Sequence, residues 1–206
     1  MKRQRPLVLT AIGTRPEVIK MAPLVRLLQG RSSFCRHLLC VTGQHDSLLH
    51  QALDMFALRP QHNFRLMRPG QQLPDLLARA VTRFSRLLKE LKPAAVLVHG
   101  DTLSSFACAW TAYQHRIPVG HVEAGLRTHD FYLPFPEESN RCLTDRLSTW
   151  CFAPTDQAAR NLRAENISRP RIWVTGNTIV DALLQLRAKA EARGRRWPQS
   201  LKKGQW

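Results

Sequence analysis

The sequence predicts an α/β fold in which helices cover both faces of a parallel β-sheet. Two patterns support this prediction: short apolar segments alternate with segments of helical spacing, and polar residues follow the apolar segments. The expected strands are Leu7–Ile12, His37–Thr42, Phe64–Met67, Ala94–His99, Ile117–His121, Thr149–Ala153 and Arg171–Val174. The expected helices are part of Pro16–Gln29, where Pro23 would kink or delay the helix, and then Ser47–Phe56, Leu73–Leu91, Leu103–His115, Glu137–Leu147, Asp156–Glu165 and Thr178–Ala190.

The composition indicates a basic globular chain. Its 206 residues are 44% hydrophobic, and 31 Lys+Arg against 15 Asp+Glu give a net charge of +16. This surplus favours anionic partners such as phosphorylated small molecules, nucleic acid or anionic membranes. Basic residues dominate residues 187–206, which we expect to form a disordered tail. No stacking-aromatic or helix-turn-helix pattern accompanies them, so nucleic acid is not the expected partner.

The cysteines and the apolar segments indicate a cytoplasmic protein. The five cysteines are odd in number and form no C-x-x-C, so we expect reduced thiols, with neither a disulfide framework nor a zinc site. The apolar run Leu7–Ile12 is too short for a secretory signal, and Arg15 and Glu17 follow at once. No segment approaches the roughly 18 apolar residues that a membrane span needs.

Polar residues follow the expected strands where each strand ends. In a parallel sheet these ends meet at one rim, where ligands bind. The groups that we expect there are Gly13-Thr14-Arg15, Gly43-Gln44-His45, Gly100-Asp101-Thr102 and His121-Val122-Glu123.

The first of these groups carries two cations at a turn from strand to helix. Helix-start N–H groups, Arg15 and Lys20 form a plausible cradle for a diphosphate. The alternative is an ordinary turn with surface cations, because neither G-x-x-x-x-G-K nor G-x-G-x-x-G is present.

The carboxylates near the rim are candidates for proton transfer. Asp101 could cap the next helix, act in chemistry, or do both. Glu123 lies beside a buried strand end, which favours a raised pKa and suits a general base. Glu137 and Arg141 are four residues apart and could pair on one helix face, with Glu138 pointing elsewhere. The alternative is a structural ion-pair network.

Two further patterns concern Asn177 and the histidines. Asn177 follows a Thr-Gly turn and is expected to cap the last helix. The histidines of these motifs lack metal-ligand spacing, so no metal is expected; they are His45, His99, His121 and His129.

With these motifs in this order, the chain resembles the UDP-N-acetylglucosamine 2-epimerase family, in its bacterial non-hydrolysing branch. The resemblance covers roughly residues 7 to 186. It rests on residues 13–24, 42–45, 69–71, 98–102, 117–128, 136–138, 140–141, 152–155 and 174–178.

The resemblance implies two Rossmann-like domains, similar to the B-type glycosyltransferase fold, with substrate in the cleft between them. The implied reaction interconverts UDP-GlcNAc and UDP-ManNAc: a base removes the C2 proton, UDP departs to leave a glucal, UDP adds back, and a proton returns on the opposite face. Such nucleotide sugars serve cell-surface polysaccharide biosynthesis. No nicotinamide or metal cofactor is implied, and family members resemble one another in forming homodimers.

By motif, the resemblance assigns roles to nine residues. The proton-handling carboxylates would be Asp101, Glu123 and Glu137, with acid and base unassigned. The groups that hold the anionic leaving group would be Arg15, Lys20 and Arg141. A second, regulatory UDP-GlcNAc site would include Gln44, His45 and Gln71.

The chain also departs from the family. Members are roughly twice as long, and their Gly-His-Arg-Arg-Glu and Asp-Ser-Gly-Gly motifs, which hold uridine and diphosphate, are absent here. We therefore expect residues 1–186 to form the N-terminal domain, without the C-terminal UDP-binding domain. Because catalysis requires an anchored substrate, we expect the chain alone to be inactive.

Three alternatives remain open. A hydrolysing epimerase would release ManNAc and UDP. A UDP-sugar glycosyltransferase would need an acceptor, and the Glu123 and Pro136-Glu137-Glu138 motifs argue against it. A non-catalytic protein would bind an intact homologue, and would co-purify with it.

Overall fold

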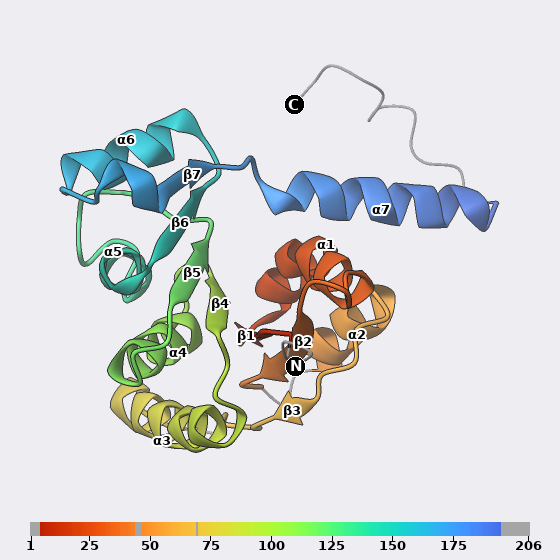
Figure 1. Cartoon of the computed structure of the whole chain (residues 1–206), viewed down its shortest axis with the longest axis horizontal. Helices are drawn as coiled ribbons and strands as arrows, with labels where there is room; N and C mark the ends of the chain where they lie inside the picture. Colours follow the sequence, from red (N-terminus) through yellow and green to blue (C-terminus); the bar gives the residue numbers. More distant parts are fainter. Residues whose placement is uncertain (1–4, 44–46, 69, 195–206) are drawn as a thin grey trace.

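The computed structural model describes residues 5–43, 47–68 and 70–194, and these form one seven-stranded parallel sheet. Its strand order is β3-β2-β1-β4-β5-β6-β7 (Figure 1). The strands are β1 Leu7–Ile12, β2 Arg36–Val41, β3 His62–Asn63, β4 Ala95–His99, β5 Val119–Val122, β6 Trp150–Ala153 and β7 Ile172–Val174. The order reverses beyond β1, between β1 and β4, and such a switch point is where parallel α/β sheets bind ligands.

Helices cover both faces of the sheet, as predicted. They are α1 Arg15–Gly30, α2 Ser47–Met55, α3 Leu73–Leu91, α4 Leu103–Gln114, α5 Glu137–Leu147, α6 Asp156–Ala164 and α7 Thr178–Ala192. Alternate residues of β2 serve opposite faces: Leu39 and Val41 pack with α1 and α2, whereas Cys40 packs with α3 and α4. α7 lies along α1, as Figure 1 shows.

The third strand was predicted in the wrong place. The paired residues are His62–Asn63, and not Phe64–Met67. Arg65 has a φ of +48°, which turns the chain out of the ladder. Phe64 and Leu66 then pack against α3, so their apolar character reflects core contacts rather than strand pairing.

The first helix begins without delay, so the predicted effect of Pro23 on its start is wrong. Two backbone donors, Gly13 N and Thr14 N, lie 2.7 and 2.6 Å from Glu17 Oε2. Pro16 supplies the fixed φ that suits a first helical turn. The helix then continues through Pro23 to Gly30. All elements other than β3 lie within two residues of their predicted bounds.

The chain beyond residue 186 begins as ordered helix. α7 continues to Ala192, so the expected start of the tail at residue 187 lies inside a helix. Lys189 Nζ donates to the Met55 carbonyl at 2.6 Å, which ties α7 to the end of α2. Residues 195–206 lie outside the described residues.

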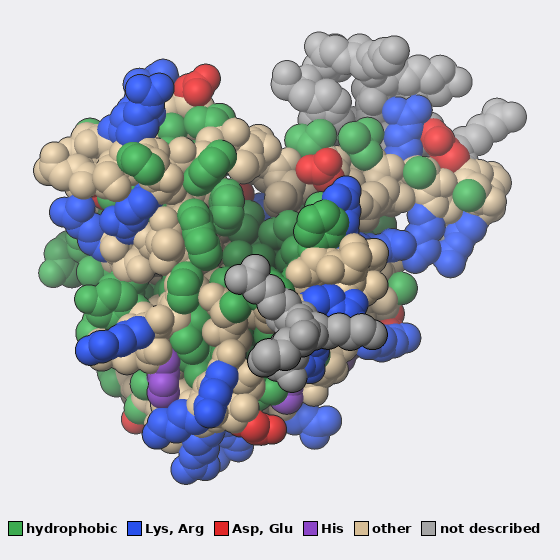
Figure 2. Space-filling model, in the orientation of Figure 1, with side chains coloured by type: hydrophobic (Ala, Val, Ile, Leu, Met, Phe, Trp, Pro, Cys, Tyr) green, Lys and Arg blue, Asp and Glu red, His purple; other side chains and the backbone are tan. Residues whose placement is uncertain are grey.

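Positively charged side chains are scattered over the face of the molecule seen in Figure 2. Figure 2 shows Lys and Arg side chains spread over one face of the molecule without a single continuous stripe. Among the described residues, no helix is both long enough and apolar enough to cross a membrane.

A packing prediction follows from Gly125. A Cβ added there would lie 2.3 Å from the Ala158 carbonyl oxygen and 2.8 Å from Leu162 Cγ, and its φ is +85°. We expect Gly125→Ala to lower the free energy of unfolding by about 2 kcal/mol or more, measured by chemical denaturation.

Gly70→Ala provides the matched control. Gly70 also has a positive φ, +67°, but nothing lies within 4 Å of an added Cβ. Its substitution should cost about 1 kcal/mol or less. Equal losses in the two variants would contradict the packing argument.

Candidate active site

The predicted convergence at the strand ends is confirmed for β4 and β5. These strands pair in parallel with His99 opposite Val122, so the residues that follow each strand reach the same rim. They place the carboxylates of Asp101 and Glu123 near one another, close to the N-terminus of α1.

Lys20 holds Glu123 by both carboxylate oxygens. Lys20 Nζ lies 2.7 Å from Oε1 and 2.8 Å from Oε2 of Glu123. Asn177 Nδ2 adds a third bond to Oε1, at 3.1 Å, while its own Oδ1 accepts from Ile179 N at 3.0 Å. The predicted cap therefore also orients Glu123, a role that the turn pattern alone did not reveal.

The pKa of Glu123 is lowered, whereas a raised pKa was predicted. Burial acts to raise the pKa, as expected, but the charge of Lys20 and the hydrogen bonds from Lys20 and Asn177 act against burial, and the pKa lies below its ordinary value. The prediction of a raised pKa is wrong because Lys20 is far away in sequence, and only the fold brings it to Glu123. Glu123 also has a φ of +68°, which strains a residue that has a side chain.

Arg141 pairs with Asp101 and Glu138, and the predicted pair with the Glu137 carboxylate is not formed. One guanidinium nitrogen lies 3.0 Å from Asp101 Oδ2, and Nε lies 3.3 Å from Glu138 Oε2. Arg141 Nε instead donates to the backbone carbonyl of Glu137, at 3.4 Å. The start of α5 turns Glu138 inward, where only 1% of it is exposed.

Glu138 was predicted to point away from the site, and this prediction is wrong. Its Oε1 accepts from the backbone N–H groups of Thr128 and His129, at 3.0 and 3.1 Å. These bonds fix the loop that leads into α5.

Asp101 has a raised pKa. Burial raises it, Arg141 opposes the rise, and the carboxylates of Glu123 and Glu137 add to it. The Asp101 backbone carbonyl accepts from Asn140 Nδ2 at 3.0 Å, which fixes the loop. Two neighbouring carboxylates thus have pKa values shifted in opposite directions, a pattern typical of acid–base sites.

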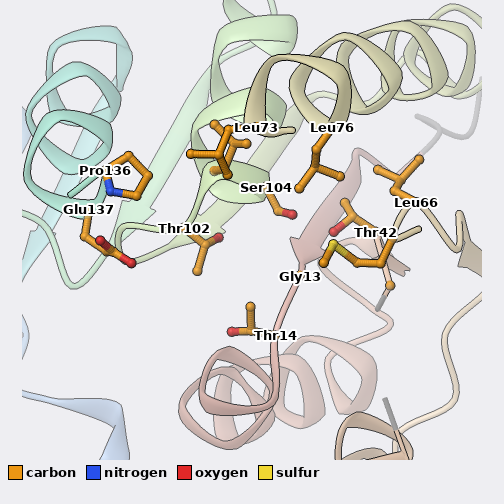
Figure 3. Close-up of a pocket in the computed structure, with 13 residues that line it drawn as sticks. Gly13, Thr14, Thr42, Leu66, Leu73, Leu76, Thr102, Ser104, Pro136 and Glu137 are labelled. Carbon is orange, nitrogen blue, oxygen red and sulfur yellow. The ribbon is translucent and has the colours of Figure 1, made fainter. Parts of the chain in front are cut away.

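Glu137 lines a separate cavity of about 240 Å³ beside these groups (Figure 3). It is lined by the hydroxyl-bearing residues Thr14, Thr42, Thr102 and Ser104 and by apolar side chains of residues 66, 67, 73 and 76. The cavity can therefore hold a ligand that has both hydroxyl groups and apolar surface.

The remaining predicted residues are less closely placed. Arg15 is exposed, and with Lys20 it lines a hollow between α1, α2 and α7. Gln71 contacts Met67, a wall residue of the Glu137 cavity, and the side chain of Arg79. Gln44 and His45 lie outside the described residues.

The buried side chain of Glu17 stabilises the rim. Its buried carboxylate accepts from Gly13 N and Thr14 N, as above, and from the hydroxyls of Thr102 and Ser105, at 2.9 and 2.6 Å. Burial raises its pKa, and these four bonds act against the rise. One carboxylate thus joins the start of α1 to the start of α4.

His121 was predicted to lie at the strand-end rim without binding a metal, and the structure gives it a role in holding the rim together. It is fully buried, with Nδ1 2.6 Å from Asp145 Oδ1 and Nε2 2.7 Å from the Gly100 carbonyl. Both ring nitrogens therefore lie within hydrogen-bond distance of an oxygen atom, which fixes the orientation of the ring. Arg127 also reaches Asp145, at 2.8 Å. This network fixes the backbone that leads to Asp101.

Known proteins resemble this chain in sequence and in fold. A family model for UDP-N-acetylglucosamine 2-epimerase matches residues 28–205. The UDP-N-acetylglucosamine 2-epimerase of Escherichia coli K12 is 49% identical over 180 residues, which make up 87% of this chain and 48% of the relative. The crystal structure of the Neisseria meningitidis UDP-GlcNAc 2-epimerase, bound to UDP-GlcNAc, is 41% identical, with a TM-score of 0.88 over 97% of this chain and 54% of that one.

The fold and the rim define a Rossmann-like domain of the kind found in B-type glycosyltransferase-like proteins. A lipopolysaccharide galactosyltransferase shares this fold, and the fold alone, at a TM-score of 0.59 and 13% identity. More particularly, the chain belongs to the UDP-N-acetylglucosamine 2-epimerase family, as the resemblance predicted. It spans about half the length of the curated relatives it matches.

A pH prediction follows from His99, which is 3% exposed and whose pKa burial lowers to about 4. The unfolded chain, with a pKa near the ordinary 6.5, binds this proton first as the pH falls. Stability should therefore drop between pH 6.5 and 4, by up to about 1.4 kcal/mol per pH unit from this residue. Chemical denaturation of His99→Gln across this range should give a shallower slope.

His37→Gln serves as the comparison variant. Burial also lowers the pKa of His37 to about 4, so its removal should flatten the same pH range. Wild-type slopes in both variants would show that neither histidine contributes to the pH dependence.

Proposed function

We propose that this chain supplies the proton-handling half of a non-hydrolysing UDP-GlcNAc 2-epimerase. The observation that carries the proposal is the pair Asp101 and Glu123, which share one rim and have pKa values shifted in opposite directions. Each is joined to a cation, Arg141 and Lys20 respectively. A reaction that removes a proton on one face and returns it on the other needs one carboxylate ionised and one protonated.

In this proposal Glu123 is the base and Asp101 the acid. Glu123 takes the C2 proton, the C–H electron pair forms the C1–C2 double bond, and the C1–O bond breaks with its electrons on UDP. UDP then adds back, while Asp101 delivers a proton to the other face of C2. Glu137 raises the pKa of Asp101 and so helps to keep it protonated.

The cations would serve the departing diphosphate. Arg15 and Lys20 lie at the start of α1, and Arg141 on α5 faces the same rim through Asp101. As negative charge moves from Glu123 to UDP, Lys20 and Arg141 can stabilise the leaving group, since both lie at this rim. The remaining contacts to uridine and diphosphate would come from outside this chain, so we keep the prediction that it is inactive alone.

A regulatory site forms a second part of the proposal. The Glu137 cavity lies beside the rim, and Gln71 contacts its wall through Met67. We assign it, with Gln44 and His45, to binding a second UDP-GlcNAc.

Homodimerisation is also proposed. Apolar side chains of Trp110, Tyr113 and Leu143 are exposed on the neighbouring helices α4 and α5, which suits a second copy. A hydrolysing enzyme and a non-catalytic partner of an intact homologue are the alternatives. Free ManNAc as product would favour the first, and binding without any turnover the second.

The test combines this chain with the second half of the Neisseria relative. Incubated with UDP-GlcNAc in deuterated water, the mixture should form UDP-ManNAc labelled at C2, measured by proton NMR, and the chain alone should not. Asp101→Asn and Glu123→Gln should each lower the rate by about 100-fold or more.

Glu191→Gln is the matched control, because it makes the same chemical change in an exposed ion pair on α7. It should retain the wild-type rate. Full activity in Glu123→Gln would refute the proposed base, and rapid turnover by the chain alone would refute its predicted inactivity.

A further inference from the structure

His99 is the last residue of β4, and its ring is buried without a hydrogen bond to another residue that the structure describes. Only 3% of the residue is exposed, and neither ring nitrogen has a hydrogen-bond partner within residues 5–43, 47–68 and 70–194. Its Nε2 lies 3.6 Å from Glu123 Oε2, beyond hydrogen-bond distance. Since buried polar groups are almost always paired, an unpaired imidazole beside a reactive carboxylate requires a chemical reason.

The contacts of Glu123 indicate which partner is missing. Lys20 donates to both carboxylate oxygens and Asn177 to Oε1, so these groups favour the ionised form. A protonated Glu123 carries an O–H that needs an acceptor. Of the groups named around the carboxylate, only the His99 ring can provide one, because the ammonium of Lys20 and the amide N–H of Asn177 are donors.

Burial lowers the pKa of His99 and keeps its ring neutral. Burial is the main cause; the charges of Lys20 and His121 act in the same direction, and Glu123 opposes them. A neutral ring with its hydrogen on Nδ1 presents the lone pair of Nε2 toward Glu123. Two acceptors then face each other, which explains the 3.6 Å separation.

We propose that His99 is a positioning residue that accepts a hydrogen bond from protonated Glu123 and so holds the abstracted C2 proton on Oε2. The proposal rests on the proposed function, in which Glu123 is the base. The C2–H bond breaks, its electrons form the C1–C2 double bond, UDP leaves with the C1–O electrons, and the proton becomes the Glu123 O–H donated to Nε2. Held there, the proton is turned away from C2, so the proton that restores C2 comes from the opposite face.

The direct test measures the ring nitrogens of His99 by NMR in the 206-residue chain. Glu123→Gln imitates the protonated carboxyl group, because its amide oxygen can accept from Lys20 while its NH₂ donates to Nε2. In wild type at neutral pH we expect a free lone pair on Nε2 and the hydrogen on Nδ1. In Glu123→Gln, the Nε2 signal should move to a hydrogen-bonded position and stay there from pH 5 to 8.

His115 provides an internal reference, since its Nε2 pairs with Ser85 at 2.8 Å, and its signal should not change. The proposal is overturned if the His99 Nε2 signal is the same in both proteins, or if Nε2 carries the hydrogen in wild type. Glu123→Ala, which offers no donor, should leave Nε2 in its free position and provides a second variant if Glu123→Gln fails to fold.

A kinetic comparison separates this proposal from the proposed function. His99→Gln keeps an acceptor oxygen and His99→Leu removes it, so C2 exchange in the reconstituted mixture should fall at least about tenfold more in His99→Leu. Equal losses would overturn the role of His99 as acceptor. If the wild-type mixture shows no exchange, the proposed function fails, and the nitrogen signals alone decide whether His99 can accept from residue 123.

Discussion

The buried carboxylate of Glu17 is the interaction on which the geometry of the rim depends. It accepts four hydrogen bonds, two from the backbone where α1 begins and two from hydroxyl groups where α4 begins. A charge buried without partners would be very unfavourable, so both helix starts must come together for the chain to fold. This requirement places Lys20, one turn along α1, opposite the loop that bears Asp101.

A second network fixes the other side of the site. His121 holds the Gly100 carbonyl, and Asp145 joins His121 to Arg127 and to the N–H of Gly125 at 3.1 Å. Glu123 lies between His121 and Gly125, so its backbone is restrained on both sides. The two networks involve different elements, and together they leave Asp101 and Glu123 little freedom to move.

The sequence alone predicted most of the fold and the location of the site, because strand ends in a parallel sheet must meet. It failed where a side chain's role depends on distant residues. Phe64 and Leu66 are apolar because α3 covers them, which no local pattern distinguishes from a strand. The direction of Glu138 depends partly on Thr128, 10 positions away, and the pKa of Glu123 depends partly on Lys20, 103 positions away. His99 and His121 gave no usable signal, because single histidines are chemically ambiguous without their neighbours.

The left-handed backbone of Glu123 has a consequence for how this protein tolerates change. A residue with a side chain at a φ of +68° costs of order 1 kcal/mol or more, and glycine would relieve that strain. A glycine here would, however, also remove the carboxylate that accepts from Lys20 and Asn177. Relief of backbone strain and retention of the carboxylate are therefore in conflict at this position.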